Sequence, residues 1–484
     1  MPTLKKGTRS SILSFLVSAF CLYLCLSAFI GGPLYAQARK ERVDVLVTGG
    51  TVVTMDADRR IIGDGAVAIR GDTIVAVGPN SDVAAKYSAR RRIDARGRIV
   101  LPGLINTHGH APMTLMRGLS DDKTLQDWLQ NYIFPAEARN VTEDYVECGT
   151  KLAIVEMIRS GTTTYVDMYY FEDAMARVTK AAGMRAVLGE TLLDFPAPDN
   201  KTHEQALAYT EQFLKRWQGD PLIRAAVAPH AIYTNSEQSL RDAVGLARRY
   251  HAPVLIHLSE TKKENDDSQA QHGLSPTAYL DKLGLLGPDV LAAHCVWLDA
   301  NDIAILARRD AACSHNPSSN MKLGSGAAPV VDMLAAGMRV GIGTDGHAGS
   351  NNDLDLMEEM DLAAKLKKVI RRDPQALPAT QAVEMATIGG ARSLHMEKEI
   401  GSLEAGKKAD LILIRTDAPH AVPMYNLYSH LVFALKASDV ETVVIGGHIV
   451  MRNSRLLTLN EAEVLAKARE YAEKVKQSLK PPAK

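Results

Sequence analysis

The sequence contains little cysteine, with only five cysteines among its 484 residues. Two of them, Cys21 and Cys25, lie in an apolar N-terminal stretch, which leaves Cys148, Cys295 and Cys313 for the rest of the chain. Three is an odd number, and their wide spacing is not that of a small disulfide-stabilised domain. We therefore expect a large hydrophobic core, rather than disulfides, to stabilise the fold.

An excess of charge of either sign is also missing. Lys and Arg together number 56, Asp and Glu together number 56, and the formal net charge is +0. No basic run is interleaved with aromatic residues, so nucleic acid is not an expected partner. Hydrophobic residues make up 46% of the chain and charged residues 23%, which is the composition of an ordinary globular protein.

Long hydrophobic runs are absent except near the N-terminus. Three basic residues within the first nine precede an apolar stretch over residues 12–30, and Ala36-Gln37-Ala38 then supplies small residues at signal-peptidase spacing. This pattern predicts a secretory signal over residues 1–38 and export to the periplasm or the medium. The apolar stretch is close to the roughly 20 residues that span a bilayer, so an uncleaved membrane anchor is the alternative.

Short β-rich segments occur at both ends of the remaining chain. Residues 43–102 contain apolar runs around Gly49-Gly50 and around Gly71-Asp72, a dipeptide favoured in hairpins. Short β-rich segments of the same kind occur again over residues 400–460. We expect the two segments to form one composite β-sandwich domain. Residues 461–484 are expected to form a terminal helix with a basic tail.

The middle of the chain, residues 103–399, alternates short apolar strands with amphipathic helical segments. Eight strands are predicted, over residues 104–110, 162–168, 185–191, 223–230, 253–259, 290–296, 311–315 and 340–345. Eight strand-then-helix units indicate a (β/α)₈ TIM barrel, although a doubly wound open sheet has the same alternation. Polar residues recur near the carboxyl ends of these strands, where barrel active sites form.

Histidines and a carboxylate at these strand ends suggest a metal site. In an extended strand, the side chains of His108 and His110 leave the same face roughly 6–7 Å apart and can converge on one ion. His257 is a candidate third ligand and Asp345 a fourth. Such a set suits Zn²⁺ and tolerates Fe²⁺. No predicted strand offers a lysine to bridge a second ion, so one metal is expected.

Other polar residues near the strand ends could handle protons. Glu260 could carry a proton beside a metal-activated water, or it could be a surface residue of the charged segment that follows it. His294 could face the same mouth or be buried in the core. His315 could shape a loop or take part in catalysis. Asp345 could instead be an Asp-Gly turn residue, although its position favours a ligand that also accepts a proton.

Several motifs in order along the chain resemble one enzyme family. They are Pro102-Gly103-Leu104-Ile105-Asn106-Thr107-His108-Gly109-His110-Ala111-Pro112-Met113, Leu115-Met116-Arg117-Gly118, Asp127-Trp128-Leu129, Ile256-His257-Leu258-Ser259-Glu260-Thr261, Ala293-His294-Cys295, Ser314-His315-Asn316-Pro317-Ser318-Ser319-Asn320 and Gly343-Thr344-Asp345-Gly346. With them the chain resembles the metal-dependent amidohydrolase superfamily. Within it, the likeness is to the branch of 5'-methylthioadenosine/S-adenosylhomocysteine deaminases and s-triazine hydrolases.

This resemblance implies a role for each matching residue. His108, His110, His257 and Asp345 would bind the metal. Zinc is the expected metal. Glu260 would protonate a ring nitrogen while metal-activated water attacks the adjacent amino-bearing carbon. His294 would orient that water, and Asp345 would carry its proton to departing ammonia.

The resemblance also implies contacts to the substrate. Glu137 would accept hydrogen bonds from two ribose hydroxyls, a role that suits a carboxylate. His230 and Trp128 match a further substrate contact and a lining residue.

The expected activity is deamination of an adenine-type nucleoside to its hypoxanthine counterpart. Branch members that accept S-adenosylhomocysteine use an arginine after the third strand, and residues 186–215 contain none. We therefore rank methylthioadenosine and adenosine above S-adenosylhomocysteine as expected substrates, because a buried carboxylate without a partner is costly to bind. The alternative is hydrolysis of an s-triazine, a pterin, a guanine-type base or a cyclic amide at the same site. A non-enzymatic binding module would need a broken ligand set, and this one is intact. The sequence leaves homo-oligomer formation open.

Overall fold

The computed structural model describes residues 2–3 and 40–479. Apart from Pro2 and Thr3, the predicted signal sequence lies outside the described residues, as do residues 480–484 of the predicted tail. Within the described part of the chain, no helix combines the length and the apolar character needed to cross a membrane.

Eight parallel strands close into a barrel in sequence order, with β13 pairing back to β6. The strands are β6 (Leu104–Asn106), β7 (Thr162–Tyr169), β8 (Arg185–Leu192), β9 (Ile223–Pro229), β10 (Val254–Leu258), β11 (Val290–His294), β12 (Ala312–His315) and β13 (Val340–Ile342). Their residues are almost all buried, since the barrel is filled inside and covered by helices outside. The predicted (β/α)₈ barrel is confirmed, and the open-sheet alternative is excluded.

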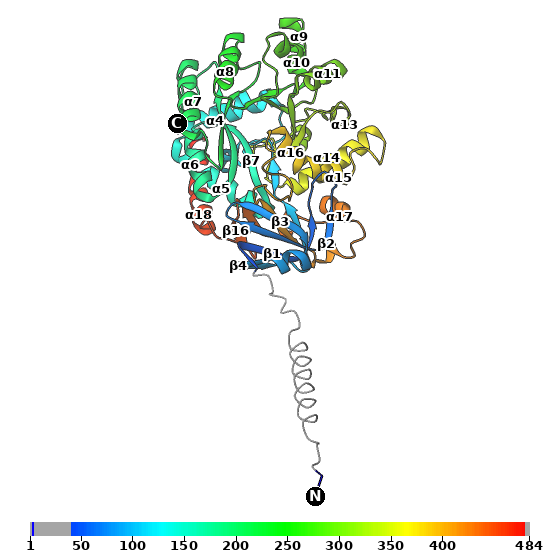
Figure 1. Cartoon of the computed structure of the whole chain (residues 1–484). Helices are drawn as coiled ribbons and strands as arrows, with labels where there is room; N and C mark the ends of the chain where they lie inside the picture. Colours follow the sequence, from blue (N-terminus) through cyan, green and yellow to red (C-terminus); the bar gives the residue numbers. More distant parts are fainter. Residues whose placement is uncertain (1, 4–39, 480–484) are drawn as a thin grey trace.

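Helices surround the barrel and connect its strands (Figure 1). The longer ones are α5 (Glu143–Ser160), α6 (Glu172–Ala182), α7 (His203–Trp217), α8 (Glu237–Arg249), α9 (Lys262–His272), α11 (Ala300–Arg309) and α14 (Leu356–Arg371). Shorter ones are η1 (Ala111–Met116), α3 (Leu125–Asp127), η2 (Trp128–Ile133), α4 (Phe134–Asn140), α10 (Pro276–Lys282), α12 (Pro317–Lys322), α13 (Val330–Ala335), α15 (Ala379–Met385) and α16 (Ile388–Ser393). Side chains of α16 pack against the barrel interior, including Ile105 and Leu255.

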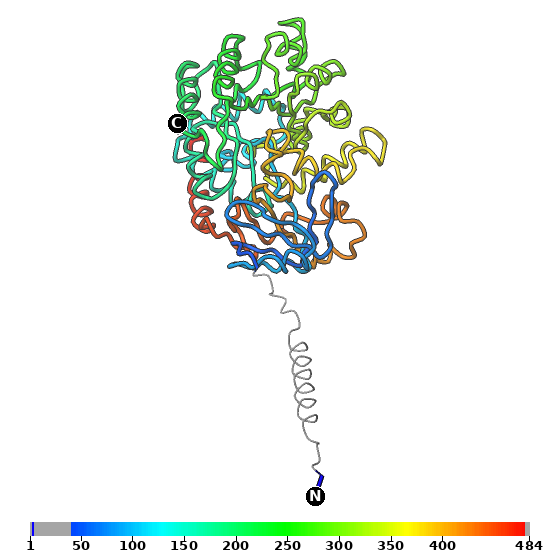
Figure 2. The backbone as a smooth tube through the Cα atoms, viewed as in Figure 1, coloured from blue at the N-terminus to red at the C-terminus, as the bar shows by residue number. Residues whose placement is uncertain are grey.

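A second sheet of nine strands is built from both ends of the described chain. It contains β1 (Glu41–Val53), β2 (Ile61–Arg70), β3 (Thr73–Pro79), β4 (Tyr87–Asp94), β5 (Arg98–Pro102), β14 (Leu411–Arg415), β15 (Val440–Ile445), β16 (His448–Arg452) and β17 (Arg455–Leu456). Antiparallel pairing of β14 with β5 joins the two ends. Figure 2 shows the blue N-terminal and orange C-terminal segments side by side at one end of the barrel. Both chain ends therefore contribute to one sheet, as the expectation of a single composite domain requires.

Successive side chains of the central strands point to opposite faces of this sheet, and each face packs into a different hydrophobic core. Ile412 and Ile414 join the large core shared with the barrel helices. Leu411 and Leu413 face the other way, into a core made within the composite sheet. The remaining helices are α2 (Asn80–Lys86), η3 (Pro419–Ala421), α17 (Leu427–Phe433), η4 (Ala437–Asp439) and α18 (Glu461–Ser478). Helix α18 lies against α5.

Two strands that lead into the site are shorter than predicted. The strand expected over residues 104–110 ends at Asn106, and the one expected over 340–345 ends at Ile342. The reason is that loop hydrogen bonds replace the ladder: the backbone N–H groups of Thr344 and Asp345 both donate to the carbonyl of His108, at 3.2 and 3.0 Å. Asp345 also has φ of 65°, which no strand residue adopts. His108 and His110 therefore converge from a loop rather than from one face of a strand.

Candidate active site at the mouth of the barrel

A cavity opens at the carboxyl ends of the barrel strands. Its walls include residues that the sequence predicts for the site, together with apolar and aromatic side chains. The lining residues are His110, Met113, Leu125, Trp128, Leu129, Ile133, Phe134, Glu137, Met168, Tyr169, Tyr170, Thr191, His230, Tyr233, His257, Glu260, His294, Leu323 and Asp345. His108 is buried beside His110 and Asp345, with 3% of its surface exposed.

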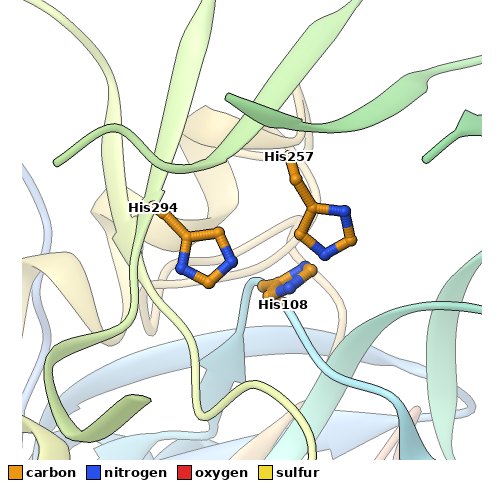
Figure 3. A group of neighbouring side chains, drawn as sticks. All are labelled: His108, His257 and His294. Atoms are coloured by element: carbon orange, nitrogen blue, oxygen red, sulfur yellow. The ribbon is translucent and has the colours of Figure 1, made fainter. Parts of the chain in front are cut away.

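The predicted metal ligands lie together on one side of this cavity. Among the described residues, two groups offer donor atoms that all lie within 4.8 Å of one another: His108, His257 and His294, and His108, His110 and Asp345. Figure 3 shows the rings of the first group turned toward a common point. The Oδ1 atom of Asp345 lies 3.3 Å from Nε2 of His108 and 3.2 Å from Nε2 of His110.

Backbone carbonyls orient two of these rings. Nδ1 of His110 lies 2.6 Å from the carbonyl oxygen of Met168, and Nδ1 of His257 lies 2.8 Å from that of His230. A carbonyl oxygen only accepts, so each Nδ1 carries the hydrogen and donates it. The Nε2 lone pairs are then left for the centre of the site, as in metal-binding histidines.

The donor set fits a single divalent cation of the zinc type. Nε2 of His108 is buried and makes no hydrogen bond. Burial lowers the pKa of His108 to about 4 and that of His257 well below its usual range, so both imidazoles are neutral. Burial lowers the pKa of His110, but the contact with Asp345 raises it to about 9, so a metal would have to displace its proton. With that proton displaced, the imidazoles and one carboxylate form the nitrogen and oxygen set that zinc prefers.

Asp345 is buried but held in its ionised form. Burial raises the pKa of this carboxyl, but contacts with His108 and His110 hold it well below its usual range. Its other oxygen, Oδ2, accepts a hydrogen bond of 2.6 Å from the hydroxyl of Ser319. The φ of 65° places Asp345 in the left-handed region, a strain typical of functional sites.

Glu260 is a buried residue of the cavity rather than a surface glutamate. Only 2% of its surface is exposed, and its Oε2 lies 3.8 Å from Nε2 of His294. Burial raises the pKa of its carboxyl well above the usual range, and the charge of Asp345 raises it further. The raised pKa favours the protonated form of Glu260, which makes this residue a candidate proton donor. The charged segment that follows Glu260 in the sequence begins at Lys262, the first residue of α9.

The two further histidines differ in position. His294 is buried at the cavity, and its Nε2 lies 4.0 Å from Oδ2 of Asp345. His315 is fully buried, is not among the residues that line the cavity, and makes no hydrogen bond through either ring nitrogen.

The three predicted substrate contacts all line the cavity. Glu137 is 4% exposed and accepts hydrogen bonds from the hydroxyls of Tyr169 at 2.7 Å and Tyr170 at 3.5 Å. The indole of Trp128 donates to the carbonyl of Ala348 at 3.0 Å, which fixes its ring in the wall. Burial lowers the pKa of His230 to about 3, so this ring is neutral.

Four residues that contact the site were not predicted individually. They are Tyr169, Tyr170, Ser319 and Asn320. Ser319 and Asn320 belong to the motif over residues 314–320. This motif indicates the enzyme family, but the sequence does not show which side chains its residues contact. Tyr169 ends β7 and Tyr170 follows it, and this strand carries no candidate ligand, so no pattern in the sequence indicates the two tyrosines.

Known proteins share both the sequence and the fold. The model of the amidohydrolase family matches residues 99–450. A 5-methylthioadenosine/S-adenosylhomocysteine deaminase of Syntrophus aciditrophicus is 51% identical over 444 residues, which cover 91% of this chain and 100% of the relative. Among solved structures, a zinc-bound adenosine deaminase of Xanthomonas campestris has a TM-score of 0.89 and 37% identity, covering 91% of this chain and 100% of its own.

A zinc-bound atrazine chlorohydrolase of Arthrobacter aurescens has the same fold at greater distance. Its TM-score is 0.82 at 25% identity, and the match covers 88% of this chain and 100% of the hydrolase. The family match spans well over half of the chain and includes the barrel with every predicted ligand. The chain therefore belongs to the amidohydrolase family.

Proposed function

We propose that this protein is a zinc-dependent aminohydrolase that converts an adenine-type nucleoside and water into the hypoxanthine counterpart and ammonia. One observation carries the proposal: the buried Glu260 lines the same cavity as Asp345 and His294, while a second buried carboxyl, Glu137, lies elsewhere in the cavity wall. A proton donor and a proton acceptor beside one cavity are what addition of water and loss of ammonia require.

The side chains divide the proton transfers between them. Glu260 donates its proton to the ring nitrogen next to the amino-bearing carbon, which makes that carbon more electrophilic. Asp345 accepts the proton that the attacking water releases, and His294 orients that water. That proton then passes to the amino group, and the C–N bond breaks with ammonia as the leaving group. The remaining hydroxyl proton returns to Glu260 as the carbonyl forms, which restores the acid.

Zinc, held by His108, His110, His257 and Asp345, would lower the pKa of water to about 7 and so supply the nucleophile at neutral pH. The zinc-bound deaminase and chlorohydrolase structures support this choice of metal. The buried Nε2 of His108, which makes no hydrogen bond, supports the position.

The cavity wall favours a nucleoside without a charged tail. None of the described residues that line the cavity is a lysine or an arginine. Leu125, Leu129, Ile133 and Phe134 supply an apolar wall instead. A 5'-phosphate or an amino-acid carboxylate would enter without a counter-charge, which is costly. Methylthioadenosine and adenosine are therefore proposed ahead of S-adenosylhomocysteine.

The test is ammonia release from a panel of purine nucleosides by the zinc-loaded enzyme. We expect methylthioadenosine or adenosine to be the best substrate, with loss of the adenine absorbance and stoichiometric ammonia. Removing the metal with a chelator should abolish turnover, and added zinc should restore it, while far-ultraviolet circular dichroism stays unchanged. Absence of ammonia from every nucleoside tested, from a preparation shown to hold one zinc per chain, would overturn the proposal.

A further inference from the structure

The motif over residues 314–320 has no role in the chemistry described so far, yet its helix contacts two of the proton-handling residues. The hydroxyl of Ser319 donates to Oδ2 of Asp345 at 2.6 Å. The side-chain oxygen of Asn320 lies 3.0 Å from Nδ1 of His294. Both Ser319 and Asn320 are fully buried in the first turn of α12.

The topology of the barrel explains why consecutive residues reach two different partners. Strand β12, which leads into α12, lies between β11 and β13. His294 ends β11, and Asp345 follows β13. Successive residues of a helix point about 100° apart, so Ser319 and Asn320 diverge to the two neighbours. The turn itself is held because the backbone N–H of Ser318 donates to Glu359 at 3.1 Å.

The contact to Asn320 decides which nitrogen of His294 carries a hydrogen. The amide nitrogen of Asn316 lies farther from Nδ1, at 3.4 Å, and the oxygen of Asn316 already accepts from the hydroxyl of Ser314 at 3.0 Å. The nearer group is the oxygen of Asn320, which only accepts, so Nδ1 carries the hydrogen. The lone pair of Nε2 then points toward Glu260 and Asp345, 3.8 and 4.0 Å away.

We propose that the first turn of α12 positions the proton-handling pair, with Asn320 selecting the Nδ1–H form of His294 and Ser319 fixing the carboxylate of Asp345. The proposal rests on the proposed function for the roles of His294 and Asp345. Ser319 and Asn320 are positioning residues, because neither lines the cavity.

Two variants at Asn320 test the selection of the tautomer. In Asn320→Asp the carboxylate can accept from Nδ1–H but cannot donate, whereas Asn320→Leu does neither. We expect Asn320→Leu to lower kcat by about 10- to 100-fold, the range for loss of an outer-shell partner, with KM changed less than about 3-fold. Asn320→Asp should restore most of kcat. If Asn320→Asp is as inactive as Asn320→Leu while both bind zinc and melt like wild type, the opposite tautomer is in use and the proposal fails.

Two variants at Ser319 test the second contact by a measurement independent of turnover. Ser319→Ala should weaken zinc binding by about 10- to 100-fold in competition with a chelator, and Ser319→Thr, which keeps the hydroxyl, should recover it. Ser318→Ala is the matched control in the same turn, and its zinc affinity should equal that of wild type. Equal zinc affinity of Ser319→Ala and Ser318→Ala would overturn this part. An inactive wild-type enzyme would refute the proposed function alone, because the affinity comparison would still stand.

Discussion

At the scale of single residues, Glu137 shows how burial tunes a substrate contact. Burial raises the pKa of its carboxyl to about 7, although the hydroxyls of Tyr169 and Tyr170 favour its ionised form. The ionised carboxylate can accept from two vicinal ribose hydroxyls, whereas the protonated form is a poorer acceptor. Substrate affinity should therefore follow the protonation of this one residue.

We predict that KM for a ribonucleoside rises as the pH falls below about 7. At higher pH, Glu137→Gln should raise KM about 10- to 100-fold. This factor corresponds to the roughly 1.5–3 kcal/mol of hydrogen bonds to a charged group. Steady-state kinetics across pH measure both effects. A substrate without vicinal hydroxyls, such as the 2'-deoxy form or a triazine, is the control and should show neither effect. An unchanged KM of Glu137→Gln with the ribonucleoside would favour hydrolysis of another heterocycle.

The same pKa has a consequence for stability, with a defined sign. A carboxyl whose pKa is raised on folding contributes stability below its unfolded value near 4.5, and this contribution is lost as the pH rises through about 7. Glu137→Gln removes the titration, so the stability of the variant should fall less than that of wild type over this range. Urea unfolding at several pH values measures the difference.

At the scale of elements, helix α5 supports the loop that carries the metal ligands. Gly149 packs against η1, which begins directly after His110. A Cβ added at Gly149 would lie 2.5 Å from the carbonyl oxygen of Pro112 and 2.7 Å from its Cα, and backbone atoms cannot yield as a side chain can. The hydroxyl of Thr114 also donates to the carbonyl of Gly149 at 2.9 Å. This close approach therefore sets the position of the loop after His110.

We predict that Gly149→Ala lowers the free energy of unfolding by about 1–3 kcal/mol, as overpacking does, and also lowers activity through displacement of η1. Gly245→Ala in α8 is the matched control, because nothing lies within 4 Å of an added Cβ there. That change should stabilise the protein by about 0.5–1 kcal/mol, since alanine favours helix over glycine. Denaturant unfolding of both variants compares the two, and equal effects would contradict the packing argument.

At the scale of the whole molecule, a buried ion pair joins the barrel to the composite sheet. Arg185, at the start of β8, donates to Asp410 at 2.9 and 3.2 Å, and both side chains are 3% exposed. The backbone N–H of Gly446 also donates to Asp410 at 2.6 Å. This pair lies at the end of the barrel away from the cavity, so it should affect stability rather than turnover.

We predict that Asp410→Ala costs about 3–5 kcal/mol of unfolding free energy, because it leaves the Arg185 guanidinium buried without a counter-charge. The double variant Arg185→Met with Asp410→Leu should be closer to wild type. The exposed pair of Lys262 and Asp266, 2.7 Å apart, is the control, and Asp266→Ala should cause no measurable loss. Equal stability of Asp410→Ala and Asp266→Ala would contradict the prediction.

Much of the fold and most of the donor set could be predicted from local patterns. Short strands such as those at 162–168 and 185–191 are buried on both faces, and their alternation with amphipathic helical segments can be recognised in the sequence. The ends of β6 and β13 could not be predicted, because hydrogen bonds between two loops far apart in the sequence determine where the ladder stops. The predicted substrate contacts all line the cavity, but nothing local pointed to Tyr169 and Tyr170 as partners of Glu137.

By itself, the sequence determined the class of fold, the order of the strands and the chemistry of the candidate ligands, because these depend on residue type and spacing along the chain. Only the tertiary structure decided that Glu260 is buried with a raised pKa, that the pKa of Asp345 is held low, and that α12 lies between the strands of His294 and Asp345. The physical reason is that pKa values and hydrogen-bond partners depend on which distant residues exclude water and come into contact. Those neighbours are brought together by closure of the barrel.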